Sequence, residues 1–159
     1  KQISKKLIIE KLEIINNSLI KDFGIQKPNI AVLGLNPHSG DGGVLGNEEK
    51  KIIIPAINSA NKIGIQAKGP FASDAFFARY NPDNYDAILA MYHDQGLIPL
   101  KLLANGNGVN FTANLPIIRT SPDHGTAFEI AGKSAADPQS TIEAFKAAYT
   151  IYKNRKRLI

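Results

Sequence analysis

The sequence predicts an α/β fold in which a mostly parallel sheet carries helices on both faces. Two short apolar runs bounded by turn residues, PNIAVLGL at 28–35 and DAILAMY at 86–92, have the character of strands buried on both sides. Segments with apolar residues at helical spacing lie before, between and after these runs. Because strands that alternate with helices pair in parallel, we expect the helices to connect the strands.

The first predicted helix covers residues 4–22, and a glycine two residues later ends it. Its apolar side chains recur at helical spacing, at Leu7, Ile8, Leu12, Ile15 and Leu19. The strand at 28–35 follows. A second helix is expected over 47–62, since its first turn carries two glutamates, and a short strand is expected over 65–67.

In the second half, Ser73 is expected to cap a helix that runs to Tyr80, because a serine hydroxyl accepts a hydrogen bond from the free amides of a first turn. The turn NPDNY then leads into the strand at 86–92. The remaining expected elements are, in order, a helix over 94–104, an NGNG turn at 105–108, extended segments at 109–112 and 116–120, and a C-terminal helix over 138–157.

Length and composition are those of a single globular α/β domain: the chain has 159 residues, of which 43% are hydrophobic. No apolar run approaches the ~20 residues of a membrane span, and the N-terminal KQISKK lacks the apolar core of a secretory signal. We therefore expect a cytoplasmic protein without a membrane partner. The absence of cysteine excludes a disulfide framework, a thiol nucleophile and a cysteine-ligated zinc site.

The net charge of +5 does not indicate a nucleic-acid binder, because the positive charge lies at the two ends of the chain. Residues 1–27 carry a net +3 and residues 150–159 a net +4, which leaves the middle at about −2. No basic stripe interleaved with aromatic side chains crosses the middle. We interpret the charged ends as solvated helix ends and predict no nucleic-acid partner.

Two of the three histidines come after the two main strands. His38 follows the first apolar run, and His93 follows the second. The carboxyl ends of parallel strands meet at one edge of an α/β sheet, where ligands bind. Imidazoles with carboxylates nearby, here Asp41 and Asp94, suit Zn²⁺, Mn²⁺ or Co²⁺. The alternative is that each histidine is a loop residue bonded to a backbone carbonyl.

The loop around His38 is rich in glycine, but its spacing is not that of a dinucleotide fingerprint. A G-x-G beginning at Gly40 requires Gly or Ala at position 45, where this chain has Leu45, and no P-loop Lys-Ser/Thr follows. The loop amides and the helix N-terminus from Asn47 could approach an anion or a metal-bound substrate. The alternative is a flexible turn.

Further polar residues with binding chemistry lie in the second half. The loop SPDHGTAFEIAGK carries Glu129 five residues after His124, and a carboxylate can accept both hydroxyls of an adenosine ribose. Lys101 and Arg119 are cations suited to phosphate or carboxylate groups, and Asn110 adds an amide. Taken singly, each is more often a surface residue, and the loop is more often an ordinary connection.

Several long segments match one family in order and content. They are GLNPHSGDGG, GPFASDAFF, YDAILAMYHDQGLIPLKLL, GVNFTANLPIIRTSPDHGTAFEIAGK and ADPQSTIEA. Together they closely resemble the C-terminal half of the 4-hydroxythreonine-4-phosphate dehydrogenase (PdxA) family over nearly all of residues 24–147. The resemblance implies an isocitrate/isopropylmalate dehydrogenase-like fold. It also implies that residues 1–159 are the C-terminal portion of a two-domain enzyme, with a helix at 1–23, an α/β metal- and substrate-binding portion at 24–137 and a helix at 138–159. The chain begins with Lys instead of Met, as expected if it is a piece of a longer protein.

The resemblance implies a role for each of the polar residues singled out above. His38 and His93 would be ligands of a divalent metal (Zn, Mg, Mn or Co). Lys101, Asn110 and Arg119 would bind the phosphorylated substrate.

The resemblance also implies a cofactor site. The loop HGTAFEIAG is similar to the adenosine-binding loop of the wider superfamily, which puts His124 against the adenine, Glu129 on the ribose diol and Gly125 among the cofactor-binding residues. This favours NAD over NADP as the cofactor. Asp74, in FASDAFF, is implied to be a further acid near the site.

The implied reaction belongs to vitamin B6 biosynthesis. The secondary hydroxyl of 4-hydroxythreonine 4-phosphate is oxidised with NAD, and loss of the adjacent carboxylate gives 3-amino-2-oxopropyl phosphate. A metal on the hydroxyl lowers its pKa and stabilises the enolate. Family members are homodimers whose metal ligands come from both subunits.

Two departures and two alternatives accompany this interpretation. The third metal histidine of the family belongs to a segment before Lys1, so the chain alone is expected to be inactive. Ser39 and Asp41 stand where the family pattern has Ala and Glu. The alternatives are a paralogous dehydrogenase of threonate or erythronate 4-phosphate, and a non-catalytic nucleotide- or metal-binding module.

Overall fold

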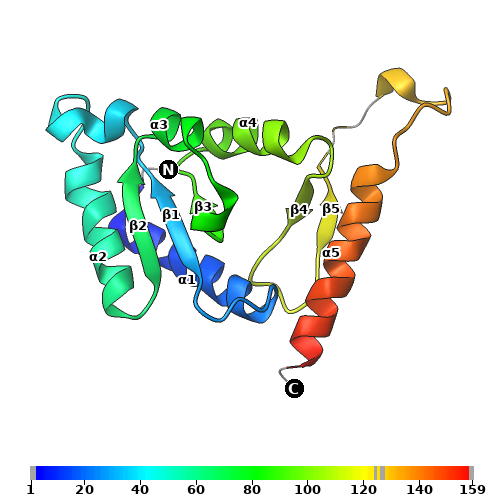
Figure 1. The fold of residues 1–159 in the computed structure, drawn as a ribbon, viewed down its shortest axis with the longest axis horizontal. Helices are drawn as coiled ribbons and strands as arrows, with labels where there is room; N and C mark the ends of the chain where they lie inside the picture. Colours follow the sequence, from blue (N-terminus) through cyan, green and yellow to red (C-terminus); the bar gives the residue numbers. More distant parts are fainter. Residues whose placement is uncertain (1–2, 124, 126–127, 158–159) are drawn as a thin grey trace.

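A parallel sheet and a separate antiparallel pair of strands form the framework of the fold. The computed structural model describes residues 3–123, 125 and 128–157. Three parallel strands, in the order β2-β1-β3, form the sheet: β1 (Asn29–Leu33), β2 (Gln66–Phe71) and β3 (Ala87–Leu89). β4 (Val109–Phe111) and β5 (Thr120–Pro122) pair antiparallel beside it (Figure 1).

Among the described residues, five α-helices surround these strands: α1 (Lys5–Lys21), α2 (Ile54–Lys62), α3 (Ser73–Ala78), α4 (His93–Ala104) and α5 (Gln139–Lys156). α3 and α4 run along the edge of the sheet at which the strand arrows end, and α5 lies beside β4 and β5 (Figure 1). None of the helices in the described ranges has the length and apolar character needed to cross a bilayer.

β1 is the centre of the hydrophobic core. Ile30 and Val32 belong to one buried cluster with α1 and α2, in which Leu12 is fully buried. Ala31 and Leu33, which point to the opposite face of the sheet, are buried as well. Burial on both faces explains the unbroken apolar run in the sequence and confirms the predicted parallel α/β sheet.

Two predicted helix starts differ from the structure. The helix expected over 47–62 opens with a π-helical turn at Glu49–Ile53, and α2 begins only at Ile54. Pro55 accounts for this boundary, since a proline fits the first turn of an α-helix and not its interior. Ser73 does not cap α3, whose N-cap is Ala72. The Ser73 hydroxyl instead accepts a hydrogen bond from Gln95.

The extended segment expected at 116–120 also differs, because only Thr120 belongs to a strand. The register pairs Phe111 with Thr120, so the residues between them form the connection of the β4–β5 pair. The carbonyls of Leu115 and Pro116 accept hydrogen bonds from Arg155 instead of entering a ladder. Strand pairing here is local and antiparallel, outside the parallel sheet.

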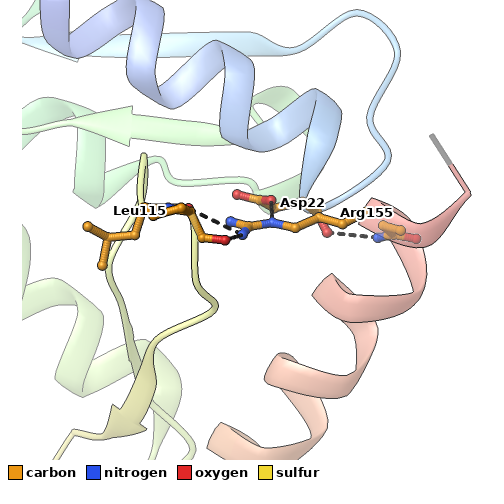
Figure 2. A network of polar contacts seen from close by, with 5 residues as sticks. Asp22, Leu115 and Arg155 are labelled. Atoms are coloured by element: carbon orange, nitrogen blue, oxygen red, sulfur yellow. Dashed lines mark hydrogen bonds and ion pairs between the residues drawn. The ribbon is translucent and has the colours of Figure 1, made fainter. Parts of the chain in front are cut away.

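A buried ion pair joins the end of α1 to α5, the helix beside the β4–β5 pair (Figure 2). The Arg155 Nε, near the end of α5, donates to the Asp22 carboxylate at 2.6 Å, just beyond α1. The two side chains are only 14% and 3% exposed. The Asn154 side chain donates to the Asp22 carbonyl at 2.8 Å, and the Arg155 Nη1 reaches the Leu115 carbonyl at 3.3 Å. One guanidinium therefore links α1, α5 and the β4–β5 connection.

Replacing Arg155 with Met is expected to lower the free energy of unfolding by about 3 kcal/mol or more, because the Asp22 carboxylate would stay buried without its partner. Urea denaturation followed by circular dichroism measures the loss. Lys11→Met is the matched control, since the Lys11–Glu10 pair is exposed and such pairs contribute about 0–1 kcal/mol. Equal, small losses in both variants would contradict a central role for Arg155.

Candidate functional site

The candidate site lies at the carboxyl edge of the parallel sheet. A cavity of about 240 Å³ is lined there by residues from three segments that follow strands. The lining residues are Leu35, Asn36, Pro37, His38, Ser73, Asp74, Tyr92 and Gln95. The cavity therefore brings together the loop after β1, the start of α3 and the residue before α4, as expected for ligand sites in α/β sheets.

The loop that carries His38 has a left-handed backbone. Six successive residues, His38 to Gly43, have positive φ, with values between 41° at Asp41 and 104° at Gly43. The conformation is natural for glycine, but His38, Ser39 and Asp41 each adopt it at a cost of about 1–2 kcal/mol. Strain of this kind persists where the surroundings hold it in place, and it occurs often at ligand sites.

Glu49 is the main anchor of this loop. Glu49 is 2% exposed, and its carboxylate accepts hydrogen bonds from the Leu35 and Asn36 backbone amides, both at 2.8 Å, and from the Asn36 side chain at 2.9 Å. The backbones of Gly34 and Gly40 lie against it, and a Cβ on Gly40 would come within 2.7 Å of the carboxylate. The glycines thus make room for the anchor.

The pKa of Glu49 reflects this environment. Burial raises the pKa, but the hydrogen bonds from the Asn36 backbone and side chain and from Leu35 outweigh burial and bring it below the ordinary 4.5. The Asn36 amide likewise lowers the pKa of the neighbouring Glu48, with which it hydrogen-bonds at 2.7 Å.

Gln95 anchors the segment that carries His93. Its side chain is buried, donates to the Gly34 carbonyl and to the Ser73 hydroxyl, both at 2.6 Å, and accepts from the Met91 amide at 2.7 Å. One amide side chain therefore joins the end of β1, the start of α3 and the loop before α4. Ser39 adds a further bond, from its hydroxyl to the Pro70 carbonyl at 3.1 Å.

The two predicted metal-ligand histidines stand after adjacent strands but line different cavities. His93 is the first residue of α4, and its exposed ring lies 2.8 Å from the Asp94 carboxylate through Nδ1. It lines an apolar cavity of about 680 Å³, whereas His38 lines the smaller one, and Tyr92 lines both. Within residues 3–123, 125 and 128–157, no three His, Cys, Asp or Glu side chains gather closely enough to hold a metal ion. The metal assignment stays a prediction.

Two of the three predicted substrate residues share one face of the β4–β5 pair. Asn110 lies opposite Ser121, and the Thr112 amide bonds to the Arg119 carbonyl, which continues the same register. Thr112 lies two residues after Asn110 and opposite Arg119, so all three side chains project from one face of the pair. The Arg119 guanidinium donates to the Thr112 hydroxyl at 2.8 Å.

Lys101 and the acid Asp74 lie on helices. The Lys101 ammonium, on α4, pairs with the Asp123 carboxylate at 3.2 Å, just beyond β5. Asp74, in the first turn of α3, lines the same cavity as His38. The structure thus joins Lys101 to the end of β5 and places Asp74 at the cavity that His38 lines.

The predicted cofactor residues are described only in part. His124 lies outside the described residues. Gly125 is exposed, and Glu129 is exposed within a short 3-10 helix at Phe128–Ile130. Their role in binding a nucleotide stays a prediction.

Sequence reasoning did not identify Glu49 and Gln95 as anchors. A signal for Glu49 was present, because it lies four residues before Ile53 and seven before Ala56, on the apolar face of the helical segment. A charged residue on such a face needs buried partners. Gln95 carried no comparable signal.

Fold and site together define an α/β domain with a ligand cavity at the carboxyl end of a parallel sheet. A family model described as "Pyridoxal phosphate biosynthetic protein PdxA" matches residues 1–148, and the chain belongs to this family. The predicted resemblance is thereby confirmed, and with it the isocitrate/isopropylmalate dehydrogenase-like fold.

Curated relatives and solved structures agree with this family. The 4-hydroxythreonine-4-phosphate dehydrogenase of Bacteroides thetaiotaomicron is 54% identical over 98% of this chain and 43% of its own length. The crystal structure of the Klebsiella pneumoniae enzyme of that name is 40% identical, with a TM-score of 0.81 over 94% of this chain and 46% of the other. A terephthalate 1,2-cis-dihydrodiol dehydrogenase structure from Burkholderia xenovorans is 30% identical, with a TM-score of 0.72 over 93% and 47%. The chain thus spans less than half the length of these proteins and matches their C-terminal part.

The lowered pKa of Glu49 makes a pH dependence of stability testable. A carboxyl group with a lower pKa in the folded chain stabilises the fold fully above its unfolded pKa, and the stabilisation is lost as the pH falls through the folded pKa. Replacing Glu49 with Gln is expected to cost about 1–3 kcal/mol near neutral pH, because buried hydrogen bonds to a charge are lost. The difference in the free energy of unfolding between the unsubstituted chain and Glu49→Gln should shrink below pH 4.5.

Urea denaturation over this pH range measures this difference. Asn61→Ala is the matched control, since it removes two backbone hydrogen bonds made by an uncharged side chain. Its loss of stability should not depend on pH. A constant loss for Glu49→Gln would contradict the assignment.

Proposed function

We propose that the chain is the C-terminal portion of an enzyme that oxidises and decarboxylates 4-hydroxythreonine 4-phosphate to 3-amino-2-oxopropyl phosphate, in pyridoxal phosphate biosynthesis. The observation that carries this proposal is 54% identity to a dehydrogenase of that name over 98% of this chain. Its relatives' names support an oxidoreductase with a nicotinamide cofactor and a phosphorylated small-molecule substrate. Residues 24–137 would supply metal and substrate contacts, between the helices at 1–23 and 138–159.

His38 and His93 would hold a divalent metal (Zn, Mg, Mn or Co). Their fit to such an ion rests on two features: both follow adjacent parallel strands, and the Nδ1 of His93 lies against a carboxylate, as is usual for ligand histidines. Two imidazoles are an incomplete set, so a third ligand would come from outside this chain. When bound, the metal would supply Lewis acidity and NAD would accept the hydride.

The substrate phosphate would bind Lys101, Asn110 and Arg119. Arg119 and Asn110 project from one face of the β4–β5 pair, where a planar guanidinium can bind two oxygens at once. Lys101 would contribute a point charge, and its present partner, Asp123, would orient it. Both cations are exposed and so accessible to a phosphate.

The adenosine of NAD would bind the loop after β5. His124 and Gly125 would face the adenine, and Glu129 would accept the ribose hydroxyls, so that a 2′-phosphate would be repelled. The exposure of Gly125 and Glu129 supports access to a cofactor. Asp74 would add a carboxylate on the side of His38. A cytoplasmic homodimer would complete the site, with metal ligands from both subunits.

A paralogous substrate is the second candidate. The structural match to a dehydrogenase of a terephthalate dihydrodiol, at 30% identity, indicates that this fold serves more than one substrate. Threonate or erythronate 4-phosphate offers the same phosphate and hydroxyl groups to the same residues.

One assay separates these candidates. The N-terminal part of the Bacteroides relative is fused to this chain, and NADH formation is measured with 4-hydroxythreonine 4-phosphate and with threonate 4-phosphate. We expect turnover of the first substrate by the fusion and little or none by the chain alone. Activity with the sugar acid only would favour the second candidate. Equal turnover by the chain alone would contradict its incompleteness.

The histidines are tested in the same fusion. His38→Ala and His93→Ala are each expected to abolish metal-dependent turnover and leave the fold intact, because both imidazoles would be lost ligands and both are exposed. Metal affinity and circular dichroism are measured together. Unchanged metal affinity in both variants would refute the ligand assignment.

A further inference from the structure

The loop that carries His38 and the segment that carries His93 are both held by hydrogen bonds to one peptide group. Gly34 and Leu35 are linked by a peptide whose carbonyl accepts the Gln95 side chain at 2.6 Å and whose amide donates to Glu49 at 2.8 Å. Glu49 belongs to the segment after the His38 loop, and Gln95 lies two residues after His93. Both polar groups of this single peptide are thus bonded to side chains from different elements.

Both side chains are buried, unlike the exposed His38 and His93, although Gln95 borders the cavity that His38 lines. Glu49 is 2% exposed and Gln95 7% exposed. The three hydrogen bonds described above for the Gln95 side chain go to protein groups, and so do those of Glu49. Their burial and their bonding indicate a role in positioning, not in contact with substrate.

We infer that Glu49 and Gln95 are positioning residues that set the place of His38 relative to His93 through the Gly34–Leu35 peptide. The inference rests on the proposed function for its metal, but not for its geometry. Left-handed residues in the His38 loop are held because Glu49 bonds two successive amides just before them. The His93 segment is held because Gln95 bonds the Met91 amide and the Gly34 carbonyl at once.

Because the Gly34–Leu35 peptide is bonded to both Glu49 and Gln95, a displacement of one segment moves the other. Loss of the Glu49 carboxylate leaves the Leu35 amide without this acceptor, and loss of the Gln95 amide leaves the Gly34 carbonyl without this donor. Either change lets the His38 loop and the segment that carries His93 move apart. Because the two act on one peptide, their effects should not add. A double substitution should therefore cost less than the product of the two single effects.

The distance between the segments is measured with two nitroxide labels. The chain contains no cysteine, so Val44→Cys and Ile98→Cys place single labels beside the His38 loop and on α4, both at exposed positions. We expect one narrow distance distribution for this labelled chain. Glu49→Gln and Gln95→Met should each broaden it and shift its mean.

Asn61→Ala is again the matched control, since its side chain bonds the backbone of Ala67 on β2, away from both histidines. It should leave the distribution unchanged. If Gln95→Met does not fold, Gln95→Glu is used, because it keeps the acceptor for Met91 and loses the amide donor. Unchanged distributions in folded variants of both residues would overturn the inference.

Zn²⁺ titration of the fusion protein described above gives the second readout. Each single variant should weaken Zn²⁺ binding about tenfold or more, the range seen when residues that orient metal ligands are lost. The double variant should lose less than the product. Full additivity would contradict action through one peptide. If the unsubstituted fusion binds no Zn²⁺, the metal part of the proposed function fails, and the nitroxide distances still decide the inference.

Discussion

The burial of β1 over residues 30–33 is the constraint on which the structure depends. Its side chains are enclosed on both faces, so the polar groups of its backbone must find partners within the protein. Pairing with β2 and β3 satisfies the strand itself. Beyond its end, the Gly34 amide bonds the Phe71 carbonyl at 2.8 Å, and the next peptides are completed by side chains. The same requirement that stabilises the core thereby shapes the edge where the cavity lies.

The β4–β5 pair and α5 depend on a different kind of contact. Phe23, after α1, packs edge-on against Phe111 of β4 with ring centroids 5.6 Å apart. The Thr120 hydroxyl donates to the Ala144 carbonyl of α5 at 2.9 Å. Together with the Asp22–Arg155 pair, these contacts attach the β4–β5 pair, with Asn110 and Arg119, to the elements around the parallel sheet that carry His38 and His93. A few specific polar and aromatic contacts thus determine how the two groups of predicted ligand residues are arranged.

The sequence alone predicts the local features well and the distant ones poorly. The apolar run at 28–35 predicts β1, and helical spacing predicts α1 and α5, because these patterns lie within a few neighbouring residues. The bounds of β5 depend on pairing with β4, which no local pattern contains. Glu49 and Gln95 bond partners 14 and 61 residues away, so their roles emerge only in the folded chain. The positions of His38 and His93 after adjacent strands follow from the α/β pattern, whereas their separate cavities do not.

The space around the Glu49 carboxylate has an evolutionary consequence. Gly34 and Gly40 offer no chemistry, yet a methyl group on Gly34 would meet the Ser39 hydroxyl at 2.9 Å, and one on Gly40 would meet Glu49 at 2.7 Å. Selection that preserves the site must therefore act on two residues that have no side chain at all. A route toward a new substrate can alter the groups that line the cavity more freely than these two glycines, whose substitution would require neighbours such as Ser39 and Glu49 to change first. Permitted mutations would then depend on the order in which they arise.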